Sequence, residues 1–216
     1  MKDILVTGFE TFGDYLINPA KEIVTLATQQ DSDSFRFHKM IFPGAIEFDG
    51  QDVGELIMHE VGKTGAKAVV SFGFDSSVAG FRLERSSYNR IDNEKYCYED
   101  QNGRPVIADR PIDEKIMTDS EQYIDFESLK EECTESGVPI VPEISDDPGR
   151  YCCNALMYKL EIAAQKSGID IPRAFIHLPY SEKLASLTVD DISDKTVVSD
   201  KNMTDFLLAL TTSLKI

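Results

Sequence analysis

Short apolar runs that alternate with helical patterns restrict the fold of this 216-residue chain more than any other feature. Continuous or alternating apolar residues predict strands, and apolar residues recurring at helical spacing predict helices. Strands that alternate with helices favour a single-domain α/β/α sandwich with a largely parallel, mixed central sheet. The predicted strands are 4–7, 35–42, 68–72, 138–141 and 174–177; the predicted helices start at Asn18-Pro19, cover 51–63, 126–136 and 203–214, and follow the turn at Pro148-Gly149.

The segment 81–106 interrupts this alternation. It is polar, resembles strands only in pieces, and contains Asn102-Gly103, a dipeptide typical of tight hairpins. We therefore expect an antiparallel excursion here. Because the chain shows no internal repeat, low-complexity segment or linker, we expect one domain that covers residues 1–216.

Composition excludes several classes of protein. The net charge of −16 argues against nucleic acid or an anionic membrane surface as a partner. No apolar run reaches the length of a membrane span, and the N-terminal residues do not resemble a secretory signal, so a cytoplasmic location is expected. The four cysteines are expected to be reduced thiols. With three histidines and no CxxC or HExxH pattern, neither a metal nor another cofactor is expected.

The segment ISDDPGRYCCNALMY, residues 144–158, places Cys153 where a turn meets a helix. An apolar stripe at helical spacing follows it, and Gly168 ends the helix. The positive end of a helix dipole favours a thiolate, which is the nucleophilic form of cysteine. The alternative is that Cys153 is a small buried hydrophobic residue.

A thiol nucleophile needs a base, and His177 is the best placed of the three histidines. His38 lies within an alternating strand and His59 within a helix, positions typical of surface or packing residues. His177 ends the apolar run 174–176, where a rigid strand would hold an imidazole in place. A core histidine with its hydrogen bonds satisfied is the alternative.

Glu84 is a candidate to orient that base, because it follows shortly after the strand that ends near Gly73. Its alternative role is a salt bridge with Arg82 or Arg85. The loop GFETFG, residues 8–13, carries Phe9 and Phe12, which suit the faces of a flat ring or else cap the core. The loops after the predicted parallel strands should gather these residues at one edge of the sheet.

Four segments, in this order, resemble the pyroglutamyl-peptidase I family of cysteine peptidases. They are ILVTGFETFGDYLINPA at the N-terminus, GFDSSVAGFRLERSSYN at 73–89, ISDDPGRYCCN at 144–154, and FIHLPY at 175–180. The resemblance implies Cys153 as nucleophile, His177 as general base and acid, and Glu84 as the group that orients His177. It selects Cys153 over Cys152 because Cys153 directly precedes Asn154. It further implies a substrate pocket formed by Phe9, Phe12, Tyr151, Phe74 and Arg90, with Cys152 either in the pocket wall or packed beside it.

The chain departs from the family pattern around these residues. In the family, an arginine usually follows the glutamate segment. An ungapped alignment places Glu94 at that position, and an alignment with a short deletion places Arg90 there. The other departures are Phe81 and Arg82 in place of an aliphatic residue and a small hydroxyl, Ser86-Ser87 in place of an apolar residue and alanine, Phe74 in place of glutamine, Pro148 in place of alanine, and Ala155 in place of a polar residue.

The resemblance implies a cytoplasmic exopeptidase that removes N-terminal pyroglutamyl residues from peptides through a thioester acyl-enzyme. Such enzymes often form dimers or tetramers. Two alternatives remain open, because the surroundings of Glu84 differ from the family pattern. One is a non-catalytic relative that binds peptide termini, and the other is a cysteine amidohydrolase that acts on another lactam or amide.

Overall fold

A computed structural model describes residues 1–30, 32–43, 47–48, 51–88, 115–117, 124–139, 142–189 and 191–216. Cys97, Arg90 and the hairpin signal at Asn102-Gly103 lie outside these ranges. The core is a six-stranded sheet with the strand order β2-β1-β5-β10-β6-β9. Its strands are β1 (Lys2–Phe9), β2 (Phe35–Phe42), β5 (Ala68–Phe74), β6 (Arg82–Glu84), β9 (Glu143–Ser145) and β10 (Arg173–Leu178).

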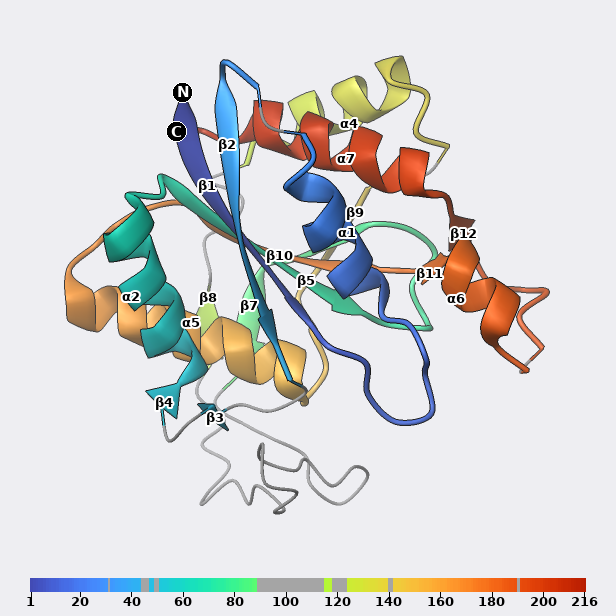
Figure 1. The fold of residues 1–216 in the computed structure, drawn as a ribbon, viewed down its shortest axis with the longest axis horizontal. Helices are drawn as coiled ribbons and strands as arrows, with labels where there is room; N and C mark the ends of the chain where they lie inside the picture. The colour runs from blue at the N-terminus through green and yellow to red at the C-terminus, as the bar shows by residue number, and fades with distance from the viewer. Residues whose placement is uncertain are drawn as a thin grey trace.

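Helices cover both faces of this sheet, as Figure 1 shows. On one face, α1 (Pro19–Ala27), α4 (Phe126–Glu135) and α7 (Asp200–Ser213) enclose an apolar core with the sheet. On the other face, α2 (Val53–Thr64) and α5 (Cys152–Ser167) enclose a second core. This arrangement confirms the predicted α/β/α sandwich.

The sheet is mixed in the way the sequence suggests. The pairs β1–β2, β1–β5, β5–β10 and β6–β9 are parallel, whereas β6 pairs with β10 in the antiparallel sense. The excursion after residue 81 therefore begins inside the main sheet. It continues in a separate antiparallel pair, β7 (Ser86–Tyr88) with β8 (Lys115–Met117).

Most predicted elements are present, and three predictions need correction. Residues 138–139 are not a strand, because the Val138 N–H donates to Cys133 O at 2.8 Å and closes the end of α4; the strand β9 begins later, at Glu143. The strand predicted over 4–7 continues to Phe9, so this phenylalanine belongs to β1 and not to the loop after it. The first residue of the predicted helix 51–63, Gln51, lies in the short strand β4 (Gln51–Asp52).

Short elements that the sequence did not reveal complete the fold. They are β3 (Glu47–Phe48), β11 (Tyr180–Ser181), α6 (Glu182–Leu187) and β12 (Val197–Val198). Within the described ranges, we find no helix that combines the length and apolarity needed to cross a membrane.

The helices α2 and α5 approach each other closely at Gly54. A Cβ at this position would lie 2.3 Å from the carbonyl oxygen of Lys159. Asp52 strengthens the contact, since its side chain caps α2 by accepting from Gly54 N at 2.8 Å and also forms an ion pair with Lys159. The absence of a side chain at Gly54 thus sets how α5 lies beside α2.

We expect Gly54→Ala to lower the free energy of unfolding by about 1–3 kcal/mol, because the added methyl overlaps backbone that cannot move aside easily. Gly62→Ala is the matched control in the same helix, since a Cβ there meets nothing within 4 Å. This control should raise stability by about 0.5–1 kcal/mol through higher helix propensity. Urea denaturation measures both, and equal effects would contradict the proposed contact.

Candidate active site

His177 lies near the carboxyl end of β10, in the interior of the sheet. Its backbone pairs with Gly73 of β5 on one side and with Arg82 of β6 on the other. The side chain is buried on the same face as Phe175, toward the core beneath α2 and α5. The two neighbouring strands therefore fix both the position and the direction of the imidazole.

Glu84 reaches His177 from the antiparallel strand β6. Glu84 pairs with Phe175, two residues before His177, so the two side chains are diagonal neighbours on one face. His177 Nδ1 lies 2.7 Å from Glu84 Oε1, and the Glu84 side chain is fully buried. When Nδ1–H donates to the carboxylate, the other ring nitrogen, Nε2, is left for a different partner.

Cys153 is the second residue of α5, as the turn-to-helix pattern predicts. Its sulfur lies over Gly73, where a Cβ would come within 2.7 Å of Cys153 Sγ. Since Gly73 is the strand neighbour of His177, the thiol and the imidazole meet above the ends of β5 and β10. Gly73 was not among the predicted site residues, and the only signal for its role was a glycine at the end of an apolar strand.

The charges around His177 favour its protonated form. Burial by itself lowers the pKa of His177, but the charge and hydrogen bonding of Cys153, followed by those of Glu84, outweigh burial and raise the pKa to about 10. Cys133 shows the opposite situation for a thiol: burial, with a smaller contribution from Glu132, raises its pKa to about 11. Cys153 is half-buried and lies beside a cationic imidazole, which is the environment of a reactive cysteine.

Polar contacts attach the turn before Cys153 to the segment after Glu84. Arg85 Nε donates to Asp146 Oδ1 at 3.1 Å, and Ser86 Oγ donates to the carbonyl oxygen of Asp146 at 2.7 Å. The Arg150 guanidinium lies 3.9 Å from the centre of the Tyr88 ring. Arg85 forms an ion pair with Asp146, and the salt bridge weighed above for Glu84 is formed with Arg82.

Asn154 holds the same two segments together from inside the protein. Its Oδ1 accepts from Tyr88 N at 2.7 Å, and its Nδ2 donates to Tyr88 O at 2.8 Å. The Asn154 side chain is fully buried. In the sequence, Asn154 only distinguishes Cys153 from Cys152, whereas in the structure it fixes the start of α5.

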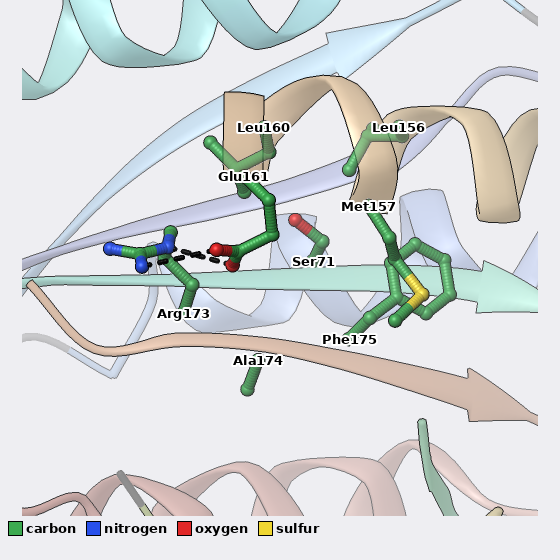
Figure 2. A pocket seen from close by; sticks show the side chains of 8 residues that line it. All are labelled: Ser71, Leu156, Met157, Leu160, Glu161, Arg173, Ala174 and Phe175. Carbon is green, nitrogen blue, oxygen red and sulfur yellow. Dashed lines mark hydrogen bonds and ion pairs between the residues drawn. The ribbon is translucent and has the colours of Figure 1, made fainter. Parts of the chain in front are cut away.

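A buried ion pair fixes the other end of this assembly, as Figure 2 shows. Arg173 at the start of β10 donates to both Glu161 carboxylate oxygens, at 2.8 and 3.2 Å. The helix rises about 12 Å from Cys153 to Glu161, and the strand rises about 13 Å from Arg173 to His177. Pairing Glu161 with Arg173 therefore brings Cys153 level with His177. The small pocket beside the pair, about 10 Å³, has room for one water molecule at most.

The residues predicted to form the substrate pocket fall into two groups. Phe9 and Cys152 are buried in the apolar core against which Cys153 packs. Phe12 is 43 % exposed and contacts Tyr15 and Phe74, with ring centres 5.5 and 6.3 Å apart. Tyr151 is half-buried at the N-cap of α5, and Arg90 lies outside the described residues. Phe9 and Phe12 thus belong to separate apolar groups.

Comparison with known proteins gives independent evidence for the family of this chain. The family model described as pyroglutamyl peptidase matches residues 2–213 of this chain. A pyrrolidone-carboxylate peptidase of Oceanobacillus iheyensis is 30% identical over 86% of this chain and 87% of its own length. One from Halalkalibacterium halodurans is 30% identical over 89% of this chain and 93% of its own.

Solved structures support the same fold. The pyroglutamyl peptidase I of Bacillus amyloliquefaciens has a TM-score of 0.78 at 19% identity, covering 99% of this chain and 94% of that one. The pyrrolidone carboxyl peptidase of Thermococcus litoralis has a TM-score of 0.76 at 21% identity, covering 99% and 93%.

We expect Gly73→Ala to slow alkylation of Cys153 by iodoacetamide at least about tenfold, because a shift of the sulfur separates it from the imidazole. The added Cβ would also lie 2.9 Å from the Phe175 ring, so the sulfur has no simple route around it. Mass spectrometry of the Cys153 peptide measures the rate, and Gly62→Ala serves as the control. An unchanged rate in a folded Gly73→Ala variant would contradict the close approach.

Proposed function

This chain belongs to the pyroglutamyl peptidase family of cysteine peptidases, and we propose that it removes the N-terminal pyroglutamyl residue from peptides with Cys153, His177 and Glu84 as its catalytic groups. The observation that carries the assignment of these roles is the 2.7 Å contact between His177 and the buried Glu84, combined with the Cys153 sulfur above Gly73.

In the proposed reaction the Cys153 thiol has passed its proton to His177, which is therefore cationic, and the sulfur attacks the pyroglutamyl carbonyl carbon. The C–N bond to the next residue breaks, and His177 passes the proton to the leaving amine. Water then attacks the thioester while His177 takes one of its protons. The C–S bond breaks, which releases pyroglutamate and regenerates Cys153 with the proton that His177 took from water. Glu84 keeps the imidazole oriented and stabilises its charged form.

The start of α5 is suited to the charge that develops on the carbonyl oxygen. Backbone N–H groups in the first turn of a helix lack intrahelical acceptors and point toward its N-terminus. We assign the oxyanion site to the N–H groups near Cys153. The lactam ring is uncharged, so apolar walls suit it; Phe9, Phe12, Phe74, Tyr151 and Cys152 remain our proposal for this pocket.

The contact between His177 and Glu84 and the position of Cys153 favour pyroglutamyl-peptide cleavage over the two alternatives. These are a peptide-binding relative and an amidohydrolase for other amides. A protein that only binds peptide termini has no need of a carboxylate aligned on a buried imidazole. A panel of pyroglutamyl, prolyl and simple lactam substrates distinguishes the three activities. Tight binding of pyroglutamyl peptides without turnover would favour the binding function instead.

The three described cysteines, Cys133, Cys152 and Cys153, are free thiols. Free thiols suit a reducing compartment, so we propose a cytoplasmic location. A dimer or tetramer stays a prediction of the family resemblance.

We expect the protein to release the fluorophore from a pyroglutamyl-coumarin substrate, and Cys153→Ala to abolish this release because the attacking atom is removed. Cys133→Ala is the matched control, since the Cys133 thiol is buried in the opposite core and should leave activity intact. Fluorescence measures the rate, and mass spectrometry locates the iodoacetamide adduct. Activity that survives in Cys153→Ala would refute the mechanism.

The pH dependence should follow the proton on His177. Because Cys153 and Glu84 raise its pKa to about 10, His177 can donate to the leaving amine at neutral pH and loses this ability as the pH rises through about 10. Glu84→Gln removes the charge that favours the imidazolium, so its alkaline limb should lie at lower pH, with kcat reduced at least about a hundredfold. A pH profile of kcat/KM measures both. An alkaline limb at the same pH in this variant would be inconsistent with the role of Glu84.

A further inference from the structure

Arg82 binds the same carboxylate oxygen as His177. Its Nε donates to Glu84 Oε1 at 2.8 Å, and His177 Nδ1 contacts that oxygen at 2.7 Å. The second arm of the guanidinium, Nη2, donates to Asp75 Oδ2 at 2.7 Å. A continuous chain of contacts therefore runs from Asp75 through Arg82 and Glu84 to His177.

The strand register explains how Arg82 reaches this position. Arg82 lies two residues before Glu84 on β6 and is paired with His177 of β10, so all three side chains share one face of the sheet. The Arg82 side chain is 19% exposed, and the Glu84 side chain is fully buried. The sequence departure noted at this position thus places a guanidinium beside the proposed catalytic glutamate.

Asp75 is itself held in place. It directly follows β5, and its Oδ1 accepts from Ser77 N at 2.8 Å and from Ser77 Oγ at 2.7 Å. Its backbone N–H donates to Leu178 O at 3.1 Å, just beyond His177. The Arg82 guanidinium is thus bound by two carboxylates, those of Glu84 and Asp75, on different segments.

We propose that Arg82, anchored by Asp75, is a positioning residue that aligns Glu84 on His177 and draws part of the carboxylate charge away from the imidazole. This inference rests on the proposed function, in which Glu84 orients His177. Arg82 acts through Glu84, and the structure gives it no direct contact with Cys153 among the described residues.

Geometry favours arginine for this task. The planar guanidinium presents donors in a fixed fork, so Nε and Nη2 bind two separate carboxylates at once. The single ammonium of lysine supplies the positive charge without this fork. A small hydroxyl at the same position would supply neither.

The electrostatic consequence follows from the groups that face His177. Cys153 from α5, Glu84 from β6 and Asp75 from the loop after β5 are the acidic groups, and Arg82 is the cation beside them. Burial raises the pKa of Asp75, but bonds from Ser77 and the charges of His177 and Arg82 lower it overall, so Asp75 stays charged. Removing Arg82 takes a cation away from Glu84, so more of the carboxylate charge acts on His177 and the site should hold its proton to higher pH.

The test compares Arg82→Gln, Arg82→Lys and Asp75→Asn with the wild type, using pH profiles of kcat and KM. In Arg82→Gln we expect the alkaline limb to move up by about 1 pH unit and kcat to fall about tenfold with KM nearly unchanged. Arg82→Lys should return the limb to the wild-type pH while recovering kcat only in part. Asp75→Asn should lower kcat severalfold, because it releases one end of Arg82.

Arg36→Gln is the control for loss of a positive charge. Arg36 lies on β2 at the opposite end of the sheet and pairs at 3.7 Å with Asp3, so its pH profile should match that of the wild type. If Arg82 were only a structural support, Arg82→Gln would lower the free energy of unfolding but leave the alkaline limb of the pH profile at the wild-type pH. That result, or a kcat equal to the wild-type value, would overturn the inference.

Alkylation of Cys153 keeps this test separate from the proposed function. If the wild type does not cleave pyroglutamyl substrates, the proposed function fails, but the pH dependence of iodoacetamide labelling still reports on the Cys153–His177 pair. Arg82→Gln should move the onset of labelling to lower pH, because a more basic His177 takes the proton of the thiol more readily, and an unchanged dependence would again overturn the inference. If Arg82→Gln does not fold by circular dichroism, Arg82→Lys and Asp75→Asn carry the comparison.

Discussion

Burial of the Glu84 carboxylate is the constraint on which the site depends. A charged group that loses all contact with water is costly unless cations and hydrogen-bond donors surround it. The antiparallel pairing of β6 with β10 supplies both, because it places Arg82 and His177 on the same face as Glu84. If β6 ran parallel to β10, this register would be lost. The one antiparallel pair in the six-stranded sheet is therefore the pair that assembles the charged groups.

The helix α5 carries the thiol, and contacts along its length fix it against the sheet. Asn154 binds the Tyr88 backbone at its start, Lys159 meets Gly54 at its middle, and Glu161 pairs with Arg173 of β10. These contacts lie on three different segments of the chain. The position of the Cys153 sulfur is thus determined by packing far from the sulfur itself, which is how a rigid scaffold places a reactive group accurately.

Much of the fold was predictable because its signals are local. The apolar runs and the helix caps at Asn18 and Gly168 depend on neighbouring residues, and the structure bears them out. The strand expected at 138–141 is not formed at 138–139, because Val138 closes the end of α4, and its apolar character does not reveal this role. The sequence does not reveal that β1 extends to Phe9, because a glycine such as the one at position 8 is typical of the start of a loop.

The three principal residues of the candidate site were predictable from the sequence, but the contacts that hold them in place were not. Cys153, His177 and Glu84 follow from motifs, and the structure brings them together. The alternatives weighed for Glu84 turned out not to be exclusive, since Glu84 contacts both His177 and Arg82. Side chains such as Asp75 and Arg173 act through contacts with other elements, with Arg82 of β6 and Glu161 of α5, and no local pattern encodes such contacts.

Gly73 has a consequence for reading related sequences. The space that a side chain would take above β5 is filled by the Cys153 sulfur, so this position and the thiol compete for one volume. A relative with a larger residue here has to displace its cysteine or do without it. We therefore expect glycine at the end of this central strand in relatives that keep a thiol at the position of Cys153.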